Sequence, residues 1–320
     1  MKRIAILFCF LLMTASAFAQ APTAGGVVNA GSYTVAGLPN SAIAQGSLFI
    51  VFGTNMGPAT LVPVTSFPLP TNLGGSNSTN GTSITISVSG TSTQALMIYT
   101  SAGQIAAVLP SRTPVGTGSL TVSYNGQTSA PLALTVVQSS FGAFTLNQAG
   151  SGSAVILDGD FNAITVLHPA APGQTVALWG TGVGPINGDD SQRPAGGDMS
   201  NIPVEVYVGT VRAPVAYRGR APGFAGVDQI NFQIPSGQLG CNVSVTVKIG
   251  AIVSNITTMA VATGGTCSDA NGLDANALQL LASKGSIRVG GIVLSRTSTQ
   301  ISVPGFSQTT TSEAGRRWIL

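Results

Sequence analysis

Apolar and polar residues alternate with a period of two along much of the chain. The alternation is clearest in four segments: 84–88, 120–124, 204–208 and 243–249. Because successive side chains of a strand point to opposite faces of a sheet, this pattern predicts strands with one buried face. Asn-Gly pairs such as Asn80-Gly81 and Asn125-Gly126 are typical of tight hairpin turns. Short strands with frequent turns predict antiparallel β-sandwiches.

The chain also contains an internal repeat. Val51–Pro58 matches Leu178–Pro185 at an offset of 127 residues, and Gln104–Pro110 matches Gln229–Pro235 at an offset of 125 residues. Matches in the same order at a nearly constant offset indicate two copies of one module. We therefore predict two tandem sandwiches.

The repeated block G-T-x-x-G-P has two interpretations. Its glycines permit backbone conformations that other residues avoid, and its proline interrupts strand pairing, so it predicts a strand end followed by a turn. A phosphate-binding loop is the alternative, but it requires a helix directly after the glycines, and neither copy is followed by a helical pattern. We favour the turn.

Several stretches resemble a known family. They are Val27–Tyr33, Gly46–Gly57, Leu69–Gly75, Gln104–Pro110, Pro172–Val176, Trp179–Pro185 and Ala221–Asn231. Together they resemble the uncharacterised C-terminal domain family that is abundant in secreted proteins of Acidobacteria. The resemblance covers roughly residues 26–262. It implies a tandem of Ig-like modules akin to IPT/TIG domains, and it implies no activity and no catalytic residues.

The N-terminus has the pattern of a secretory signal peptide. Lys2 and Arg3 precede an apolar run, which is followed by the small-residue motif Ala17-Phe18-Ala19. The apolar run is too short to span a bilayer as a helix, so we predict cleavage after Ala19. We expect no transmembrane span after cleavage and a location that is extracellular, at the cell surface or periplasmic.

Composition narrows the class of protein further. Charged residues make up 7% of the chain, while glycine occurs 41 times among 320 residues, which argues against a mostly helical protein. The net charge is +3, and two of the basic residues, Lys2 and Arg3, belong to the predicted signal peptide. The remainder is nearly neutral, so nucleic acid is not an expected partner.

Two cysteines, Cys241 and Cys267, remain after removal of the signal peptide. In an exported chain they predict one structural disulfide, and two buried free thiols are the alternative.

These observations divide the chain into four parts. Residues 1–19 form the signal peptide, 20–139 the first Ig-like module, 140–263 the second, and 264–320 a C-terminal extension. In the extension we expect a short helix over Leu273–Ser283 and strands at Ser286–Leu294 and Gln300–Val303, with an unstructured end. The extension is either a complete helix and hairpin or part of an incomplete third domain.

Few residues suggest catalytic chemistry. His168 is the single histidine and precedes Pro169 without a nucleophile motif, so we interpret it as a surface or turn residue. Asp158-Gly159-Asp160 begins like a calcium loop but lacks the later glycine and glutamate, so we expect a turn. Asp189 and Asp190, together with Asp198, are expected to be solvated turn carboxylates, and a weak cation site is the alternative. We expect no cofactor, no metal and no enzymatic activity.

A basic and aromatic cluster is the weak ligand-binding candidate: Arg212, Tyr217, Arg218 and Arg220. The predicted function is adhesion, binding or domain spacing by an exported non-enzymatic protein, with a surface glycan or another extracellular protein as partner. The alternative is a carbohydrate-binding accessory module. That role needs exposed aromatic side chains, whereas Trp179 is expected in a core strand and Trp318 near the chain end.

Overall fold

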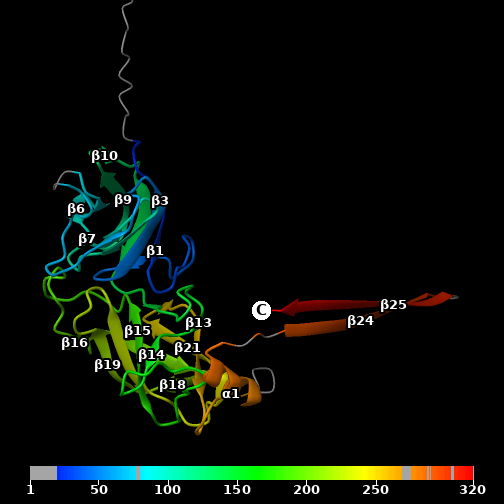
Figure 1. Ribbon diagram of the computed structural model, residues 1–320. Helices are drawn as coiled ribbons and strands as arrows, with labels where there is room; N and C mark the ends of the chain where they lie inside the picture. Colours follow the sequence, from blue (N-terminus) through cyan, green and yellow to red (C-terminus); the bar gives the residue numbers. More distant parts are fainter. Residues whose placement is uncertain are drawn as a thin grey trace, which may run out of the picture.

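The computed structural model describes residues 20–76, 80–268, 275–286, 288, 290–303 and 306–319. Within them the chain forms two stacked β-sandwiches, followed by a helix and a two-stranded hairpin (Figure 1). We call the upper sandwich of Figure 1, which contains strands β1 to β11, module 1, and the lower sandwich, which contains β12 to β23, module 2. The predicted signal peptide lies outside the described residues.

Module 1 consists of two sheets. The first runs in the order β1 (Thr23–Asn29), β3 (Leu48–Thr54), β8 (Gln104–Val108), β7 (Leu96–Thr100) and β4 (Val62–Pro63). The second runs in the order β2 (Ile43–Ala44), β11 (Leu132–Val137), β9 (Gly116–Tyr124), β5 (Ser83–Val88) and β6 (Thr91–Gln94), with β10 (Gln127–Thr128) paired to β9.

Module 2 repeats this plan. Its first sheet runs in the order β12 (Gly142–Ala143), β15 (Thr175–Thr181), β20 (Asp228–Gln233), β19 (Val215–Arg220) and β16 (Gly197–Asp198), with β14 (Ile156–Leu157) paired to β15. Its second sheet runs in the order β13 (Gly152–Ser153), β23 (Thr257–Val261), β21 (Gly240–Ile249), β17 (Val204–Val208) and β18 (Val211–Ala213), with β22 (Ile252–Val253) paired to β21.

The strand order of both modules is that of an immunoglobulin-like sandwich. When the main strands of a module are lettered A to G in chain order, one sheet runs A-B-E-D and the opposing sheet runs G-F-C. In module 1 these are β1-β3-β8-β7 and β11-β9-β5, and in module 2 they are β12-β15-β20-β19 and β23-β21-β17. The predicted fold class is therefore confirmed, and each sheet draws its strands from one repeat.

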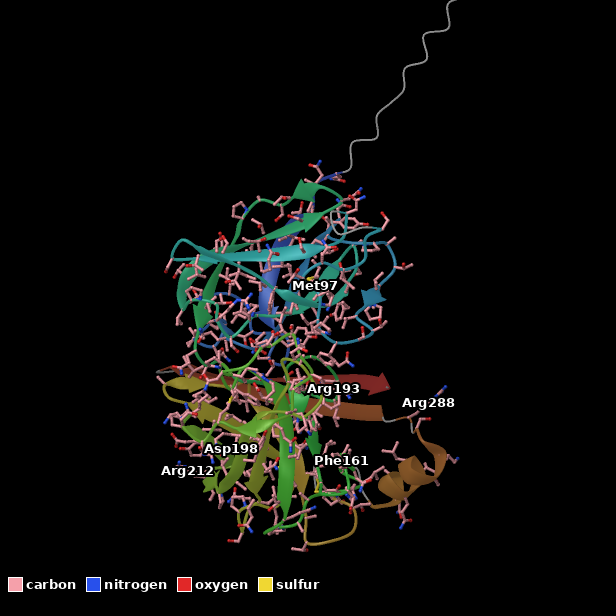
Figure 2. All side chains as sticks on the ribbon, turned by 90° about the vertical axis from the view of Figure 1, so that its left-hand side faces the viewer. Met97, Phe161, Arg193, Asp198, Arg212 and Arg288 are labelled. Carbon is pink, nitrogen blue, oxygen red and sulfur yellow. A yellow bond between two sulfur atoms is a disulfide. The ribbon has the colours of Figure 1, made fainter. Side chains whose placement is uncertain are left out.

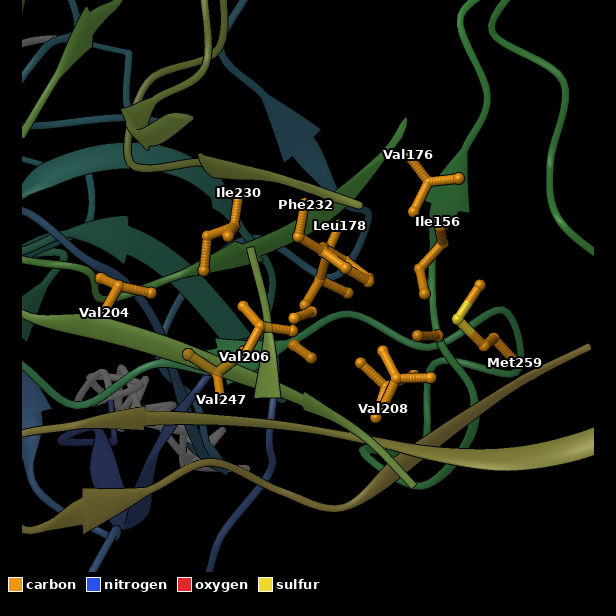
Figure 3. Close-up of a cluster of buried hydrophobic side chains, with 14 of the residues drawn as sticks. Ile156, Val176, Leu178, Val204, Val206, Val208, Ile230, Phe232, Val247 and Met259 are labelled. Atoms are coloured by element: carbon orange, nitrogen blue, oxygen red, sulfur yellow. The ribbon is translucent and has the colours of Figure 1, made fainter. Parts of the chain in front are cut away.

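Each sandwich encloses an apolar core that follows from the period-two pattern. Ile84, Ile86 and Val88 of β5 are fully buried, and the polar residues between them lie on the outer side of the sheet. Figure 3 shows the same arrangement in module 2, where valines of β17 face apolar side chains of β15 and β20. Burial of each such side chain contributes about 1.5–3 kcal/mol before entropy costs.

The C-terminal extension differs in part from the prediction. The helix is present as α1 (Ala275–Lys284), close to its predicted place. The two predicted strands, however, belong to one strand, β24 (Gly290–Val303), which pairs antiparallel with β25 (Phe306–Ile319). Threonine has a high strand propensity, so the Ser/Thr segment between the predicted strands continues the strand instead of forming a turn. The chain end, expected to be unstructured, is the second strand of a hairpin that projects sideways from module 2 (Figure 1).

The predicted disulfide is present. Cys241, at the beginning of β21, is joined to Cys267 with a Cα–Cα distance of 5.5 Å. Both residues are buried, and the amide of Cys267 donates to the carbonyl of Val166 at 2.7 Å. The disulfide therefore holds the segment after β23 against module 2.

Candidate functional site

The two modules meet at a buried ion pair. Arg220 ends β19 and Asp228 begins β20, and the two residues lie opposite each other in the strand ladder. Nη1 of Arg220 donates to Oδ1 of Asp228 at 2.6 Å, and the side chains are 3% and 0% exposed. The other carboxylate oxygen accepts from the amides of Gly182 at 2.7 Å and Val183 at 2.8 Å. The carboxylate thus fixes the backbone of the G-T-x-x-G-P segment of module 2.

Opposing effects act on the pKa of Asp228. The pKa of its carboxyl group is raised, mainly by burial, and the guanidinium of Arg220 and the two backbone amides oppose this rise. All three partners are donors, which matches an ionised carboxylate. Such a buried pair contributes little net stability, but removal of one partner leaves an uncompensated charge. The pair therefore fixes geometry at the junction.

Module 1 packs directly on this pair. Gly46, in the turn before β3, has a φ of +70° and approaches the pair so closely that a Cβ atom there would overlap the guanidinium of Arg220. Nη2 of Arg220 also donates to the carbonyl of Gly184 at 3.3 Å. A glycine is thus required at position 46 for both its backbone conformation and the close approach.

Thr181 connects the modules through its hydroxyl group. Its Oγ1 accepts from the amide of Leu48 in module 1 at 2.7 Å and donates to the carbonyl of Gly226 in module 2 at 2.6 Å. The residue is completely buried. Thr181, the last residue of β15, therefore links its own strand to the segments that contain Leu48 and Gly226.

Asn29, the last residue of β1, connects the modules on a second side. Its Nδ2 donates to the carbonyls of Ser140 at 3.1 Å and Thr181 at 3.3 Å. Its Oδ1 accepts from the amides of Gly31 at 2.7 Å and Ser32 at 3.2 Å. Asn29 is 1% exposed, and both the oxygen and the nitrogen of its side-chain amide are hydrogen-bonded. It therefore joins the end of β1 to module 2.

The acidic loop after β15 forms a third connection. Asp190 accepts from the amide of Ser111 at 2.7 Å and from its hydroxyl at 2.9 Å. The carbonyl of Ser191 accepts from the amide of Leu69 at 2.7 Å. The expectation of solvated turn carboxylates is therefore wrong for Asp190, because its partner comes from the other module, a contact that local sequence does not show.

The predicted basic and aromatic cluster is divided by the fold. Arg212 lies on β18, in the G-F-C sheet, where its Nε is 3.7 Å from Glu205. Arg218 lies on β19 in the opposing sheet and pairs with Asp198 at 3.3 Å. Tyr217 bonds through its hydroxyl to the carbonyl of Arg220 at 2.7 Å. Figure 2 shows Arg212 and Asp198 at the surface of module 2, whereas Arg220 is buried, so the four residues do not form one patch.

His168 and Asp158 form a surface clip. His168 Nε2 lies 2.7 Å from Asp158 Oδ2, and Asp158 Oδ1 accepts from the amides of Asp160 at 2.9 Å and Asn162 at 2.8 Å. The bond from His168 and those from the loop hold the pKa of Asp158 well below its usual range. The loop is a turn closed on itself, and among the described residues no group of three acidic, His or Cys side chains is placed to hold a metal ion.

The clip presents an exposed aromatic side chain. Phe161 lies within the loop, is 77% exposed and has a φ of +63°, a conformation that bulky residues rarely adopt. Its position on module 2 is shown in Figure 2. Asp158 and the surrounding turn therefore hold a large apolar group in solvent at a cost in backbone energy.

Trp179 lies beside this loop, in contrast to the prediction of a core position. Val176 and Leu178 of β15 face the core, so alternation places Trp179 on the outer face, where it is half-buried. Phe224 contacts its ring edge-on, with centroids 5.6 Å apart. Trp179 and Phe161 line a small hollow together with Gln229 and Asn231 of β20. Nε2 of Gln229 donates to Oδ1 of Asn231 at 2.7 Å.

We call the surface formed by Phe161, Trp179, Gln229 and Asn231 the aromatic face of module 2. It combines aromatic rings with amide groups that donate and accept hydrogen bonds. The period-two pattern of β15 is sufficient to predict that Trp179 points outward, because Val176 and Leu178 point inward. The contribution of Phe161 comes from a turn and has no comparable sequence signal.

No family model matches the chain, and no curated protein matches it. Among solved structures, the I9–I11 tandem of titin is 10% identical, with 69% of this chain and 62% of that chain covered and a TM-score of 0.20. A glucan-locus protein of Bacteroides ovatus, SGBP-B, in complex with a mixed-linkage heptasaccharide is 12% identical, with 87% and 64% covered and a TM-score of 0.30.

A third similar structure comprises domains 5–6 of the S-layer protein SbsC, at 14% identity, with 75% of this chain and 98% of that chain covered and a TM-score of 0.23. The chain spans less than two thirds of the first matched structures, with 62% of the titin fragment, 18% of a plexin A4 ectodomain and 46% of a Bacteroides thetaiotaomicron protein. The assignment of the fold rests on the strand order of the two modules.

Proposed function

We propose that this is an exported, non-enzymatic protein whose two Ig-like modules, residues 20–139 and 140–263, act as one rigid unit for binding or for spacing at the cell surface or outside the cell. The observation that carries the proposal is the junction. Tandem domains joined by a simple linker move relative to each other unless their interface is extensive. Here Asn29, Thr181 and Asp190 each connect the modules around the buried pair of Arg220 and Asp228.

Export is supported by the disulfide. A bond such as Cys241–Cys267 forms and persists in oxidising compartments and is rare in the cytosol. In the part of the chain that the structure describes, no helix is long and apolar enough to cross a membrane. The predicted cleavage site after Ala19 would place Gln20 at the mature N-terminus.

The absence of enzymatic activity is part of the proposal. Acid–base catalysis by His168 would require its ring to act on a substrate within a shaped site. In the structure Nε2 of His168 is engaged by Asp158, and the histidine side chain is 50% exposed on a turn. This arrangement favours a structural role for the pair.

Export and rigidity can be tested separately. N-terminal sequencing of protein secreted by its native host should begin at Gln20, and retention of Met1 on cytoplasmic protein would contradict export. Small-angle scattering of the mature chain should fit the docked modules together with their C-terminal extension. A distribution of intermodule distances that widens freely would contradict the rigid unit.

A second candidate function, carbohydrate binding, is favoured by the aromatic face of module 2. The flat faces of aromatic rings stack on the C–H faces of sugars, and neighbouring amides bond sugar hydroxyls. Trp179 and Phe161 supply rings, and Gln229 and Asn231 supply amides. Among partners, this surface favours a glycan over an extracellular protein.

Affinity electrophoresis of the mature chain in gels containing individual polysaccharides tests this candidate. Retardation by one polysaccharide that Trp179→Ala and Phe161→Ala both abolish would support it. Phe52→Ala is the matched control, because Phe52 occupies the position of Trp179 in the other repeat and is also exposed. Equal retardation of all three variants, or none for the wild type, would contradict carbohydrate binding at this face.

A further inference from the structure

A hollow near the junction is lined mostly by apolar side chains. It has a volume of about 630 Å³, within the usual range of small-molecule sites. Apolar side chains from both modules line most of it, among them Leu48, Ile98 and Phe67 of module 1 and Phe224 of module 2. We call this hollow the junction groove.

A second hollow of about 390 Å³ adjoins the junction groove. Leu48 and Ile98 line both hollows, and the second is further lined by Tyr33, Tyr99 and Phe144. The apolar surface therefore extends beyond the junction groove across the outer side of the A-B-E-D sheet of module 1. A surface of this shape suits an elongated apolar group.

One positive charge lies in the junction groove. Among its described lining residues, Arg193 is the only charged one. Arg193 is exposed, and neither an ion pair nor a hydrogen bond occupies its guanidinium in the described part of the chain. Figure 2 shows it at the level where the modules meet.

The position of Arg193 is fixed by its neighbours along the chain. The carbonyl of Ser191 accepts from the amide of Leu69 at 2.7 Å, which ties the loop to module 1. The carbonyl of Pro194 accepts from the amide of Gly223 at 2.8 Å, which ties it to the loop that carries Phe224. The backbone is thus anchored on both sides of the arginine, and less ordering is needed when an anion binds.

We propose that the junction groove binds a small amphipathic anion, with one carboxylate or equivalent group on a long apolar chain. The anionic group pairs with the guanidinium of Arg193, which presents donors in the geometry of a carboxylate. The apolar chain lies over Leu48 and Ile98 toward the second hollow. This site adjoins the aromatic face of module 2 through the contact of Phe224 with Trp179, but Trp179 and Phe161 do not line it. It rests on the docked arrangement of the modules, because both contribute to its lining.

The test is a titration of the mature chain with dodecanoate at submicellar concentration. Binding is measured by isothermal titration calorimetry. We expect one saturable site per chain whose affinity falls with added salt. Arg193→Gln should weaken binding about tenfold, the effect of one charged hydrogen-bonded pair. Dodecan-1-ol, which has the same chain without the charge, should bind more weakly than dodecanoate.

Two matched variants make the test specific. Arg212→Gln removes an exposed arginine that lies in the G-F-C sheet of module 2, away from the groove, and should leave binding unchanged. Phe224→Ser should weaken both dodecanoate and dodecan-1-ol, because it removes part of the apolar lining. The absence of saturable binding, or equal affinities of the Arg193→Gln and Arg212→Gln proteins, would overturn the proposal.

Discussion

The two modules have the same strand order, yet the repeated G-T-x-x-G-P block serves different purposes in them. In module 1 it forms a turn held within the module, where the amides of Gly53 and Met56 donate to the carbonyls of Gly103 and Ala102, and Thr54 is exposed. In module 2 the equivalent Thr181 is fully buried and bonds across the junction. Where module 2 has Asp228 to hold this block, module 1 has Gly103. The core pattern determines the fold of each module, whereas a few polar residues determine which copy of the repeated block takes part in the interface.

The outer faces of the A-B-E-D sheets differ in the same way. In module 1, Ile50 and Ala106 are buried beneath Tyr33 and Phe144. The equivalent positions of module 2 are Ala177 and Asn231, and they lie in the open hollow beside Trp179. The face of module 1 thus packs partly against module 2, whereas the equivalent face of module 2 presents polar groups in an open hollow.

The largest expected effect tests the buried pair. Asp228→Ala leaves Arg220 and two amides without their acceptor, and it should lower the free energy of unfolding by about 3–5 kcal/mol. Gly103→Ala is the matched change in module 1, where a Cβ has ordinary space, with the nearest atom, the carbonyl oxygen of Gly53, 3.9 Å away. It should change stability by less than about 0.5 kcal/mol. Urea denaturation measures both, and similar losses in the two variants would remove the distinction between the modules.

The disulfide gives the next largest effect, and it concerns module 2 alone. Cys241→Ala combined with Cys267→Ala should cost about 2–4 kcal/mol by releasing the constraint on the unfolded chain. Hydrogen exchange should then show faster opening of β21 and β23, while β5 and β9 of module 1 keep their protection. Equal loosening of both modules would show that the disulfide acts beyond its own sandwich.

A smaller effect comes from the two equivalent threonines. Thr181→Val removes a hydroxyl that accepts from Leu48 and donates to Gly226, so it should cost about 1–3 kcal/mol. Thr54→Val, at the exposed copy of the motif, should be within about 0.5 kcal/mol of wild type. Thermal unfolding distinguishes them, and a neutral Thr181→Val would mean that its bonds do not hold the junction.

The smallest effect is a pH dependence at the surface clip. The pKa of Asp158 is lower in the folded than in the unfolded chain, so its contribution is present above the unfolded pKa of about 4 and is lost as the pH falls below it. Asp158→Asn should therefore lower the free energy of unfolding at pH 7. It should also make the free energies of unfolding at pH 7 and pH 3 more similar than they are in the wild type. Urea titrations at both pH values measure this, and an unchanged difference would assign the acid sensitivity elsewhere.

The sequence predicts the repeated sandwiches, because alternation is a local property of each strand. It predicts the disulfide, because only two cysteines follow the predicted signal peptide and they allow a single pairing. The burial of Thr181 and the partner of Asp190 are not predictable in this way, since both depend on contacts between residues far apart in the chain. Asp228 carried a weak signal, as an acidic residue at a position where the other copy has Gly103. The strand β24 was divided in the prediction because its Ser/Thr run resembles a turn in composition but not in conformational preference.

Residual dipolar couplings of the backbone amides test the rigid junction most directly. They are measured on the mature chain in a weakly aligning medium, with the couplings of each module fitted separately. The account predicts one alignment tensor, identical in magnitude and orientation for module 1 and module 2. Two tensors of different magnitude would show that the modules move independently and would contradict the junction as described.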